Sequence, residues 1–561
     1  MQVIFTIMKR LIFIIVLGCI SSISFPQIRI DWQQCYGSME TDEARCIIPN
    51  ETGGYRVAGK VGEVSGMVGC NFEDVNRCWL IEIDGYGEFV SENCISKFSP
   101  SKLIELDESS FYLAGVGSRN SEIDRYIEVK KYRNDGTLEW KTQAGNDEKG
   151  VGETPRVALT SDGGVVATSF VQWPCGPGGE YYGMNDAWVV KINSEGEQEW
   201  EIMLGSEGFE MPACVLGESN GNVLVSIAGY ALGNGNVASC HRTKSDAIIT
   251  ELSADGEILW SRCYGGDESG DGFSCIAELS DGYLFAGYTE SEDGDLEGAG
   301  YHLGYINNLP AYGRTRDIWL MRTDFEGDIL WSRCYGGTGN ESAKQVFQNE
   351  DGGFTVFGTT KSLDGDVVST HNLQYNNEQM QSKIWVFRTD DQGNLIWERA
   401  IGTQKRALET VADVIKHNDK EYTIAATAYP NHFEMTGDYY CSNDTIIPYS
   451  NENFWVLHIT DIFNYDDPTG IEEQPKVVPL QMNVHPNPAT TWVAIDYILP
   501  NGNAKAELSV FNAMGVKVKQ VELEGNEGQK VLDLRGLAPG VYFITLYCDG
   551  LRKLEKLVVT M

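Results

Sequence analysis

The chain has few basic residues for its length. Among 561 residues there are 43 Lys and Arg against 81 Asp and Glu, which gives a formal net charge of −38. A field of this sign repels phosphate backbones and anionic lipid. The composition therefore excludes nucleic acid as a partner.

Long hydrophobic runs are also missing. The apolar run at 11–18 is shorter than the roughly 20 residues that a membrane-spanning helix needs. It follows Lys9 and Arg10 and precedes small serines, which is typical of a secretory signal peptide. We predict a signal peptide at 1–24, cleaved after Ser24, and no transmembrane span. Because Val16 to Cys19 also resembles a bacterial lipobox, a lipoprotein anchored at Cys19 is the alternative.

Residue patterns for catalysis are absent as well. The seven histidines are scattered and no pair has metal-ligand spacing. Acidic residues are so abundant that no two stand out as an acid–base couple, and neither a Gly-x-Ser-x-Gly motif nor a phosphate-binding loop has a supporting context. The sequence thus nominates no catalytic and no cofactor-binding residue.

Glycine and aromatic residues, in contrast, are plentiful and periodic. A turn glycine is followed by Trp four residues later and by another glycine after five more. The copies are Gly136-Trp140-Gly145, Gly196-Trp200-Gly205, Gly256-Trp260-Gly265, Gly327-Trp331-Gly336 and Gly393-Trp397-Gly402. Trp32-Gly37 begins the series, and Gly87-Ser91 is a degenerate copy. A second Trp slot lies in a later strand of the unit, as at Trp188, Trp319, Trp385 and Trp455.

Each repeat has the alternation of four short strands over about 50–70 residues. Seven such units over 27–462 predict an all-β, seven-bladed β-propeller-like domain, with a β-solenoid as the alternative. The array resembles the propeller-like repeats with Asp-Gly-Gly and Trp motifs of many exported bacterial surface proteins. A residue that recurs in every unit favours packing between blades over a ligand-stacking role for the Trp side chains.

The fourteen cysteines raise the question of disulfides, since the chain is predicted to be exported. Cys35 with Cys46, and Cys263 with Cys275, occupy similar places in their repeats and could bridge neighbouring strands. Cys334 fills the slot of Cys263 without a partner, so semi-buried packing cysteines are the alternative.

Two loops carry alternating carboxylates around a glycine. They are Asp293-Gly294-Asp295 and Asp364-Gly365-Asp366, in consecutive repeats. Carboxylate oxygens are the ligands of Ca²⁺, so Asp293, Asp295, Asp364 and Asp366 form a candidate calcium site. The alternative is a pair of solvated turns, because turns use Asp and Gly.

The repeat stops before the C-terminus. Residues 463–481 are acidic and contain proline without alternation, which indicates a linker. Residues 482–561 alternate again and predict a small Ig-like β-sandwich.

Four motifs in this last segment carry a specific resemblance. They contain Pro486-Asn487-Pro488, Gly515 after Val510-Phe511, Pro539-Gly540 with Tyr542, and the terminal Lys553-Leu-Glu-Lys556. Together they resemble the type A C-terminal sorting domain of the type IX secretion system. The resemblance implies a periplasmic intermediate after Sec export, handling by the type IX secretion machinery, and final release or attachment at the outer cell surface.

We therefore expect an exported, non-enzymatic binding or adhesion protein with a glycan or a surface protein as ligand. A propeller enzyme acting on glycans, a glycoside hydrolase or a lyase, is the alternative, because the fold alone does not choose between them.

Overall fold

The computed structural model describes most of the chain between residues 28 and 560. Within this range the undescribed segments are 39–40, 63–66, 70–76, 108, 119–124, 146–150, 153, 173–181, 232–233, 241–244, 268–269, 307–312, 370–381, 403–407, 429–452, 464–480, 500–505, 513–516, 524–526 and 549–550. The predicted signal peptide with Ser24 and Cys19, most of the linker, and Gly515 lie outside the described residues. The chain divides into two compact units, 1–463 and 464–561.

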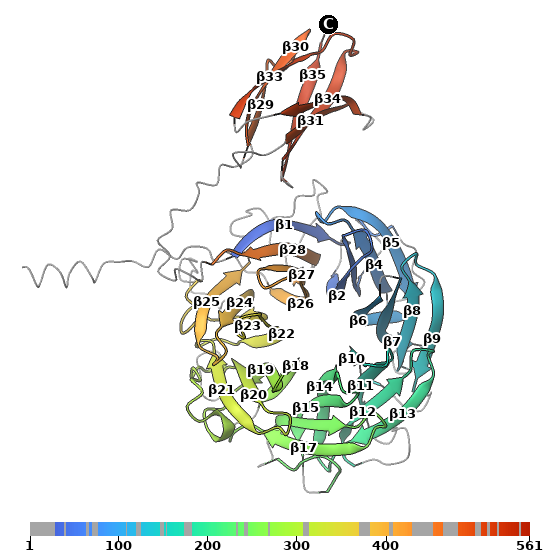
Figure 1. The fold of residues 1–561 in the computed structure, drawn as a ribbon, viewed down its shortest axis with the longest axis vertical. Helices are drawn as coiled ribbons and strands as arrows, with labels where there is room; N and C mark the ends of the chain where they lie inside the picture. Colours follow the sequence, from blue (N-terminus) through green and yellow to red (C-terminus); the bar gives the residue numbers. More distant parts are fainter. Residues whose placement is uncertain are drawn as a thin grey trace, which may run out of the picture. The chain divides into compact units, whose positions relative to one another are not determined.

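The first unit consists of four-stranded antiparallel sheets arranged around an axis (Figure 1). The first three blades in chain order are β2 (Glu43–Pro49), β3 (Tyr55–Lys60), β4 (Arg77–Ile83) and β5 (Phe89–Ser96); β6 (Phe98–Asp107), β7 (Ser110–Ser118), β8 (Arg125–Arg133) and β9 (Leu138–Ala144); and β10 (Arg156–Leu159), β11 (Val165–Gln172), β12 (Asn185–Ile192) and β13 (Gln198–Leu204).

The next three blades repeat this order. They are β14 (Phe209–Gly217), β15 (Val223–Tyr230), β16 (Asp246–Leu252) and β17 (Ile258–Tyr264); β18 (Gly272–Leu279), β19 (Gly282–Thr289), β20 (Asp317–Thr323) and β21 (Ile329–Tyr335); and β22 (Ser342–Gln348), β23 (Phe354–Thr360), β24 (Lys383–Thr389) and β25 (Leu395–Ile401). A single parallel bridge between Asn185 and Phe209 links the third and fourth blades.

The seventh blade joins the two ends of the array. Its strands β26 (Glu409–Lys416), β27 (Glu421–Ala428) and β28 (Asn453–Asp461) are completed by β1 (Ile28–Tyr36), which pairs antiparallel with β28. Trp32 therefore starts the Trp series without a turn glycine before it, because its strand finishes the last blade. The predicted seven-bladed propeller is confirmed, and this closure by β1 was not foreseen.

Buried carboxylates shape the connections between blades. Asp42, Glu210 and Glu341 stand at or just before the innermost strand of a blade and are fully buried. Each accepts a hydrogen bond from the backbone N–H four residues earlier, namely that of Ser38, Ser206 and Gly337. The acid thus closes the tight turn through which the chain enters the next blade.

The two Trp slots have different environments. The Trp side chains of the third strands are completely buried: Trp79, Trp188, Trp319, Trp385 and Trp455. Four of these indole N–H groups donate to a side chain on the fourth strand thirteen residues later, namely that of Glu92, Glu201, Ser332 or Glu398. Trp455 donates to Gln33 on β1, which is the fourth strand of the closing blade. A buried Trp needs such a partner for its N–H. The packing interpretation is confirmed for this slot.

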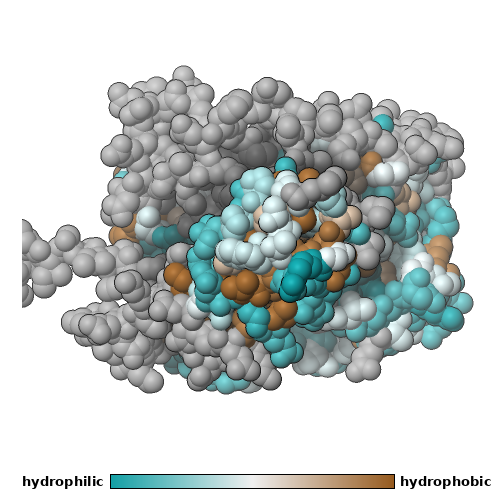
Figure 2. All heavy atoms as spheres, turned by 90° about the horizontal axis from the view of Figure 1, so that it is seen from above, coloured by the Kyte–Doolittle hydropathy of each residue, from teal (hydrophilic) through white to brown (hydrophobic). Residues whose placement is uncertain are grey.

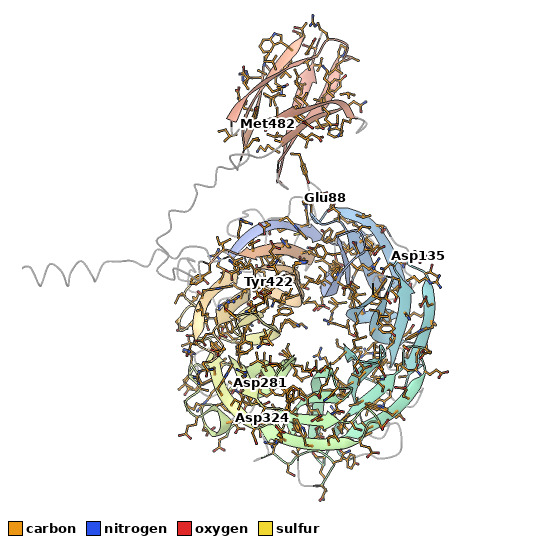
Figure 3. The ribbon with its side chains drawn as sticks, in the orientation of Figure 1. Glu88, Asp135, Asp281, Asp324, Tyr422 and Met482 are labelled. Atoms are coloured by element: carbon orange, nitrogen blue, oxygen red, sulfur yellow. A yellow bond between two sulfur atoms is a disulfide. The ribbon has the colours of Figure 1, made fainter. Side chains whose placement is uncertain are left out.

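Fourth-strand Trp side chains instead contact the neighbouring blade. The rings of Trp140 and Trp200 lie under the outer turns of the following blade, so that a Cβ at Gly196 or Gly256 would come within 2.8 Å of the ring. Tyr264 and Tyr335 similarly donate to the carbonyls of Gly327 and Gly393 in the next blade. These contacts hold each blade against its successor. Acidic side chains such as Asp135 lie in the outer turns, at the rim of the ring (Figure 3).

The second unit is a β-sandwich. One sheet has β29 (Gln481–His485), β30 (Trp492–Ile498) and β33 (Glu527–Asp533). The other has β31 (Ala506–Asn512), β32 (Lys517–Leu523), β34 (Gly540–Cys548) and β35 (Leu551–Val559). Val493, Leu508, Ile544 and Leu557 are among its fully buried core residues. Hydrophobic side chains also appear in patches among hydrophilic ones on the face seen in Figure 2.

Candidate functional site: a basic central channel

The innermost strands of all seven blades line one cavity on the propeller axis. Its volume is about 450 Å³. Six of the seven inner strands carry a β-bulge at the same place, beside Ala44, Pro100, Pro212, Phe273, Ala343 and Val411. A bulge leaves one residue unpaired and re-aims its side chain. The bulges thus supply Arg45, Ser101, Ser274 and Lys344 to the cavity wall.

The charged residues of this wall are mostly basic. Four cations line the cavity: Arg45, Lys102, Arg156 and Lys344. Among the described lining residues the one carboxylate is Asp413. The charge of the channel wall is therefore opposite in sign to the net charge of the whole chain, which is −38.

Only part of this positive charge is neutralised. The Lys102 Nζ lies 2.8 Å from Asp413 Oδ1, and Arg45 pairs with Glu43. The Nε of Arg45 is buried and has no hydrogen-bond partner. Within the described part of the chain, neither Arg156 nor Lys344 has a hydrogen-bond or ion-pair partner, and both side chains are exposed to the channel.

Proton affinities in the channel reflect this crowding of like charge. Burial and the positive charge of Arg156 lower the pKa of Lys344 to about 8, and Lys102 and Arg45 act in the same direction. Burial and the nearby Arg45 also lower the pKa of Arg156. Lys102 differs, because its pair with Asp413 outweighs burial and raises its pKa. Burial and like charges thus disfavour the charged forms of the unpaired cations. A bound anion would offset this unfavourable free energy.

The neutral lining residues offer little competing chemistry. Ser274 donates to the Ala343 carbonyl at 2.6 Å and Ser101 to the Ala114 carbonyl at 3.1 Å. Cys214 and Cys275 are free thiols. Burial raises the pKa of Cys275 to about 12, so this thiol stays protonated and unreactive.

Sequence reasoning missed these basic residues, although a signal was present. Arg45 and Lys344 each follow a buried turn acid, Asp42 and Glu341, by three residues. Aligning the repeats on that acid would have placed both side chains in the same ring of the channel. The recurring Trp and Gly residues instead mark the outer strands of each repeat.

The proposed calcium ligands lie in two separate, equivalent loops. Asp293 accepts from the N–H of Asp267 and Asp295 from that of Gly265. Asp364 and Asp366 accept in the same way from Thr338 and Gly336. Each carboxylate therefore orders a neighbouring turn, and calcium binding there stays a prediction.

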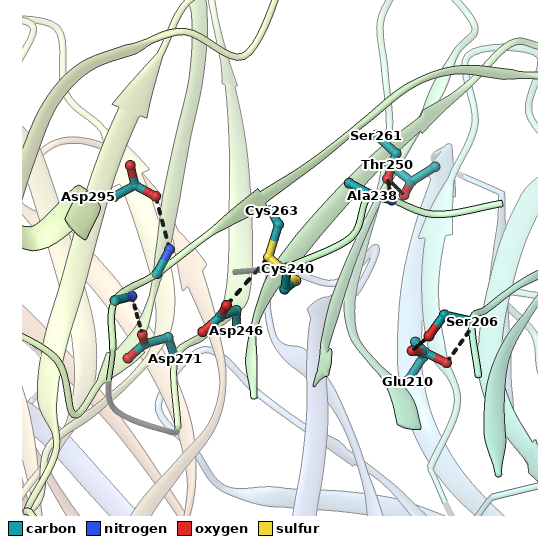
Figure 4. Close-up of a disulfide and its surroundings, with 12 residues drawn as sticks. Ser206, Glu210, Ala238, Cys240, Asp246, Thr250, Ser261, Cys263, Asp271 and Asp295 are labelled. Atoms are coloured by element: carbon teal, nitrogen blue, oxygen red, sulfur yellow. Dashed lines mark hydrogen bonds between the residues drawn. A yellow bond between two sulfur atoms is a disulfide. The ribbon is translucent and has the colours of Figure 1, made fainter. Parts of the chain in front are cut away.

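The disulfide pairs suggested by repeat position are wrong. Cys263 is bonded to Cys240, 23 residues earlier, while Cys275 is free (Figure 4). Cys46 is also free and fully buried, whereas Cys35 is disulfide-bonded. Cys46 belongs to a packed core cluster and Cys275 to the lining of the channel. Asp246 lies 3.7 Å from the Cys263 sulfur, but the disulfide removes both thiolates that a metal ion would need.

Two histidines that looked isolated in sequence come together at the closing blade. Thr423 Oγ1 lies 2.8 Å from His417 Nε2 and 2.9 Å from His458 Nδ1, and Trp32 stacks on His458. Burial lowers the pKa of both imidazoles. Strand β1 brings Trp32 to this cluster, so it serves the closure of the ring.

The Pro-Asn-Pro motif of the second unit contacts its terminal strand. Pro486 and Pro488 follow cis peptide bonds. The Asn487 side chain donates to the Lys556 carbonyl and accepts from the N–H of Val558 at 2.9 Å. Tyr542, just after Pro539-Gly540, is buried and donates to the Ala538 carbonyl. The motif residues thus join the first and last strands of the sandwich.

Comparison with known proteins agrees with this second unit. Residues 483–560 match the family model of the secretion system C-terminal sorting domain. Such a domain implies handling by the type IX machinery and export to the cell surface or secretion. Among the described residues, no helix is long and apolar enough to cross a membrane.

For the propeller, similarity is found only at the level of structure. No curated protein matches the chain. Similar solved structures include the Dos1 propeller (9% identity, 76% of this chain and 95% of that chain, TM-score 0.39). Others are an α-L-arabinofuranosidase of Fusarium graminearum (10%, 58% and 93%, 0.33) and prolyl oligopeptidase B from Galerina marginata (9%, 82% and 56%, 0.37). At these identities and TM-scores the similarities carry no inference about activity.

Proposed function

We propose that this chain is an exported binding or adhesion protein, in which the C-terminal sorting domain delivers a propeller that binds a ligand outside the cell. The observation that carries the proposal is the sorting-domain match at 483–560. The propeller is closed by its own strands β1 and β28, so the exported part does not depend on the sorting domain for its last blade. The predicted signal peptide at 1–24 supplies the first export step.

Deletion of residues 483–560 tests the delivery. In a host with type IX machinery we expect the full chain at the cell surface or in the medium and the truncated chain trapped in the periplasm. The trapped protein should be protease-resistant, because the ring closes without the deleted residues. Truncated protein at the surface in normal amounts would contradict the sorting role and favour anchoring at Cys19.

Ligand binding is tested separately on the purified full chain. We expect it to bind members of a glycan and matrix-protein array without changing them. Retained, chemically intact ligand supports a binding protein, and no retained ligand contradicts it.

A lyase acting on acidic glycans is the second candidate, and one observation favours it. Lys344, whose pKa is lowered to about 8 by burial and by Arg156, has the proton affinity of a general base and shares the channel with the Arg156 guanidinium, which could hold a carboxylate. In β-elimination, Lys344 in its neutral form would take the proton next to the carboxylate, a C=C bond would form, and the glycosidic C–O bond would break. The electron pair of that bond would stay on the leaving oxygen, which would take a proton from water. The unsaturated product absorbs in the ultraviolet, so an absorbance increase with polygalacturonate, lost in Lys344→Gln, would establish this activity.

A hydrolase in the channel is not supported. Glycoside hydrolysis generally uses a pair of carboxyl groups. The described channel wall offers Asp413 alone, and this carboxylate is paired with Lys102.

A further inference from the structure

The unneutralised cations of the channel indicate what it binds. Arg156 on β10 and Lys344 on β22 come from different blades, yet both line the cavity and the positive charge of Arg156 acts on Lys344. Without a partner, two like charges in a confined space cost free energy. Packing does not require a lysine at the bulge position of Lys344, since other inner strands hold Ala213, Ser274 and Ala412 there.

We propose that the central channel binds a small polyanion, a molecule carrying at least two carboxylate, sulfate or phosphate groups. This inference rests on the proposed binding function and names the ligand class. The Arg156 guanidinium offers a planar fork that suits a carboxylate or phosphate, and the Lys344 ammonium offers a compact charge for a second anionic group. Arg45, which is paired with Glu43, adds further positive charge to the same wall.

The size of the cavity agrees with a small molecule. A volume of about 450 Å³ falls within the range of ordinary ligand sites, roughly 300–1,000 Å³. Lys102 contributes less, because Asp413 already neutralises it at 2.8 Å. Two anionic groups on one ligand would match the two cations that lack partners.

Calorimetric titration of the purified full chain tests the proposal. The anionic probes are citrate, tripolyphosphate and trigalacturonate, and maltotriose is the neutral probe. We expect saturable binding of at least one anionic probe and none of maltotriose. Which anion binds distinguishes a free polycarboxylate, a polyphosphate and an acidic sugar as the source of the ligand.

Matched variants locate the binding site. Arg156→Gln and Lys344→Gln should each weaken binding by about tenfold or more, as expected for loss of a charge-assisted hydrogen bond. Lys141→Gln, which removes the same charge from an exposed position on β9, should change the affinity by less than about twofold. Because the channel cations repel one another, the channel variants should melt at or above the temperature of the unmodified protein.

The pH dependence provides an independent readout. Lys344 faces Arg45, Lys102, Arg156 and Asp413 from four other inner strands, and the thiols of Cys214 and Cys275 from two more. Since its ammonium loses the proton near pH 8, anion affinity should fall as the pH rises through about 8, and Lys344→Gln should remove this step.

Absence of binding by all three anions, equal binding of maltotriose, or affinity unchanged in both channel variants would overturn the inference. These failures are distinct from failure of the proposed function. If the chain is exported and retains a neutral ligand on the array, the polyanion inference fails but the proposed binding function stands. If the chain is not exported, the proposed function fails, but anion binding by the purified protein can still be measured.

Discussion

The indole N–H of Trp200 donates a 2.8 Å hydrogen bond to the carbonyl of Ala254, across the boundary between the third and fourth blades. The ring also lies under Gly256, whose φ is +85°. This turn of one blade therefore rests directly on the Trp of the blade before it.

Gly256→Ala should test this contact. The new Cβ would lie 2.8 Å from the Trp200 ring, and the positive φ adds strain for any residue with a side chain. Gly136→Ala is the matched control, because Gly136 has φ +84° and open space around it. We expect the control to cost about 1 kcal/mol and Gly256→Ala about 1–3 kcal/mol more, measured by denaturant unfolding. Equal losses would show that the ring contact contributes nothing.

The two Trp slots should also differ in stability. Trp385 is fully buried and its N–H is satisfied by Glu398, so Trp385→Ala should cost about 3–5 kcal/mol. Trp260 is only partly buried, and Trp260→Ala should cost less, about 1–3 kcal/mol. Unfolding curves of both variants give the comparison. A larger loss for Trp260 would contradict the assignment of third-strand Trp residues as the blade core.

These two slots show how far the sequence predicts the fold. Spacing alone identifies blades, because Trp140 and Trp200 recur with the turn glycines that they contact. It does not show that β1 completes the last blade, since pairing between Trp455 and Cys35 joins positions at opposite ends of the array. The channel was likewise hidden, because Arg156 and Lys344, which are 188 residues apart in sequence, line one cavity only in the closed ring.

Stability should depend on pH through Glu210. Burial, aided by the charge of Asp186, raises the pKa of this carboxyl to about 7, above its ordinary value of about 4.3. Between these pH values the native state binds a proton that the unfolded chain does not, so this contribution to stability is complete below about pH 4 and is lost as the pH rises through 7. The Glu210→Gln variant has no titrating carboxyl at this position. The melting temperature of the variant minus that of the unmodified protein should therefore increase from pH 5 to pH 8.

The Gln side chain can keep both contacts to Ser206, by accepting from its N–H and donating to its hydroxyl. Exposed Glu257→Gln is the control and should show no such trend. A constant difference between Glu210→Gln and the unmodified protein across this pH range would contradict the raised pKa.

Calcium at the two Asp-Gly-Asp loops can be tested by melting. If Asp293 and Asp364 bind the ion, millimolar Ca²⁺ should raise the melting temperature, because a ligand specific for the native state stabilises it. Asp293→Asn combined with Asp364→Asn should abolish the rise. An identical melting temperature with calcium and with chelator would contradict calcium binding. Asp293 and Asp364 would then serve only to order the turns at Asp267 and Thr338.

Asn487 should be needed for the sorting domain to hold its terminal strand. Its amide donates to the Lys556 carbonyl and accepts from the Val558 N–H, while Ala489 bonds the same strand through its backbone. Asn487→Ala removes both side-chain bonds from β35, and we expect about 1–2 kcal/mol lower stability and reduced surface delivery of the full chain. Asn483→Ala, at an exposed position on β29, is the matched control and should be delivered normally. Normal delivery of Asn487→Ala despite a destabilised sandwich would show that the machinery does not need an ordered terminal strand.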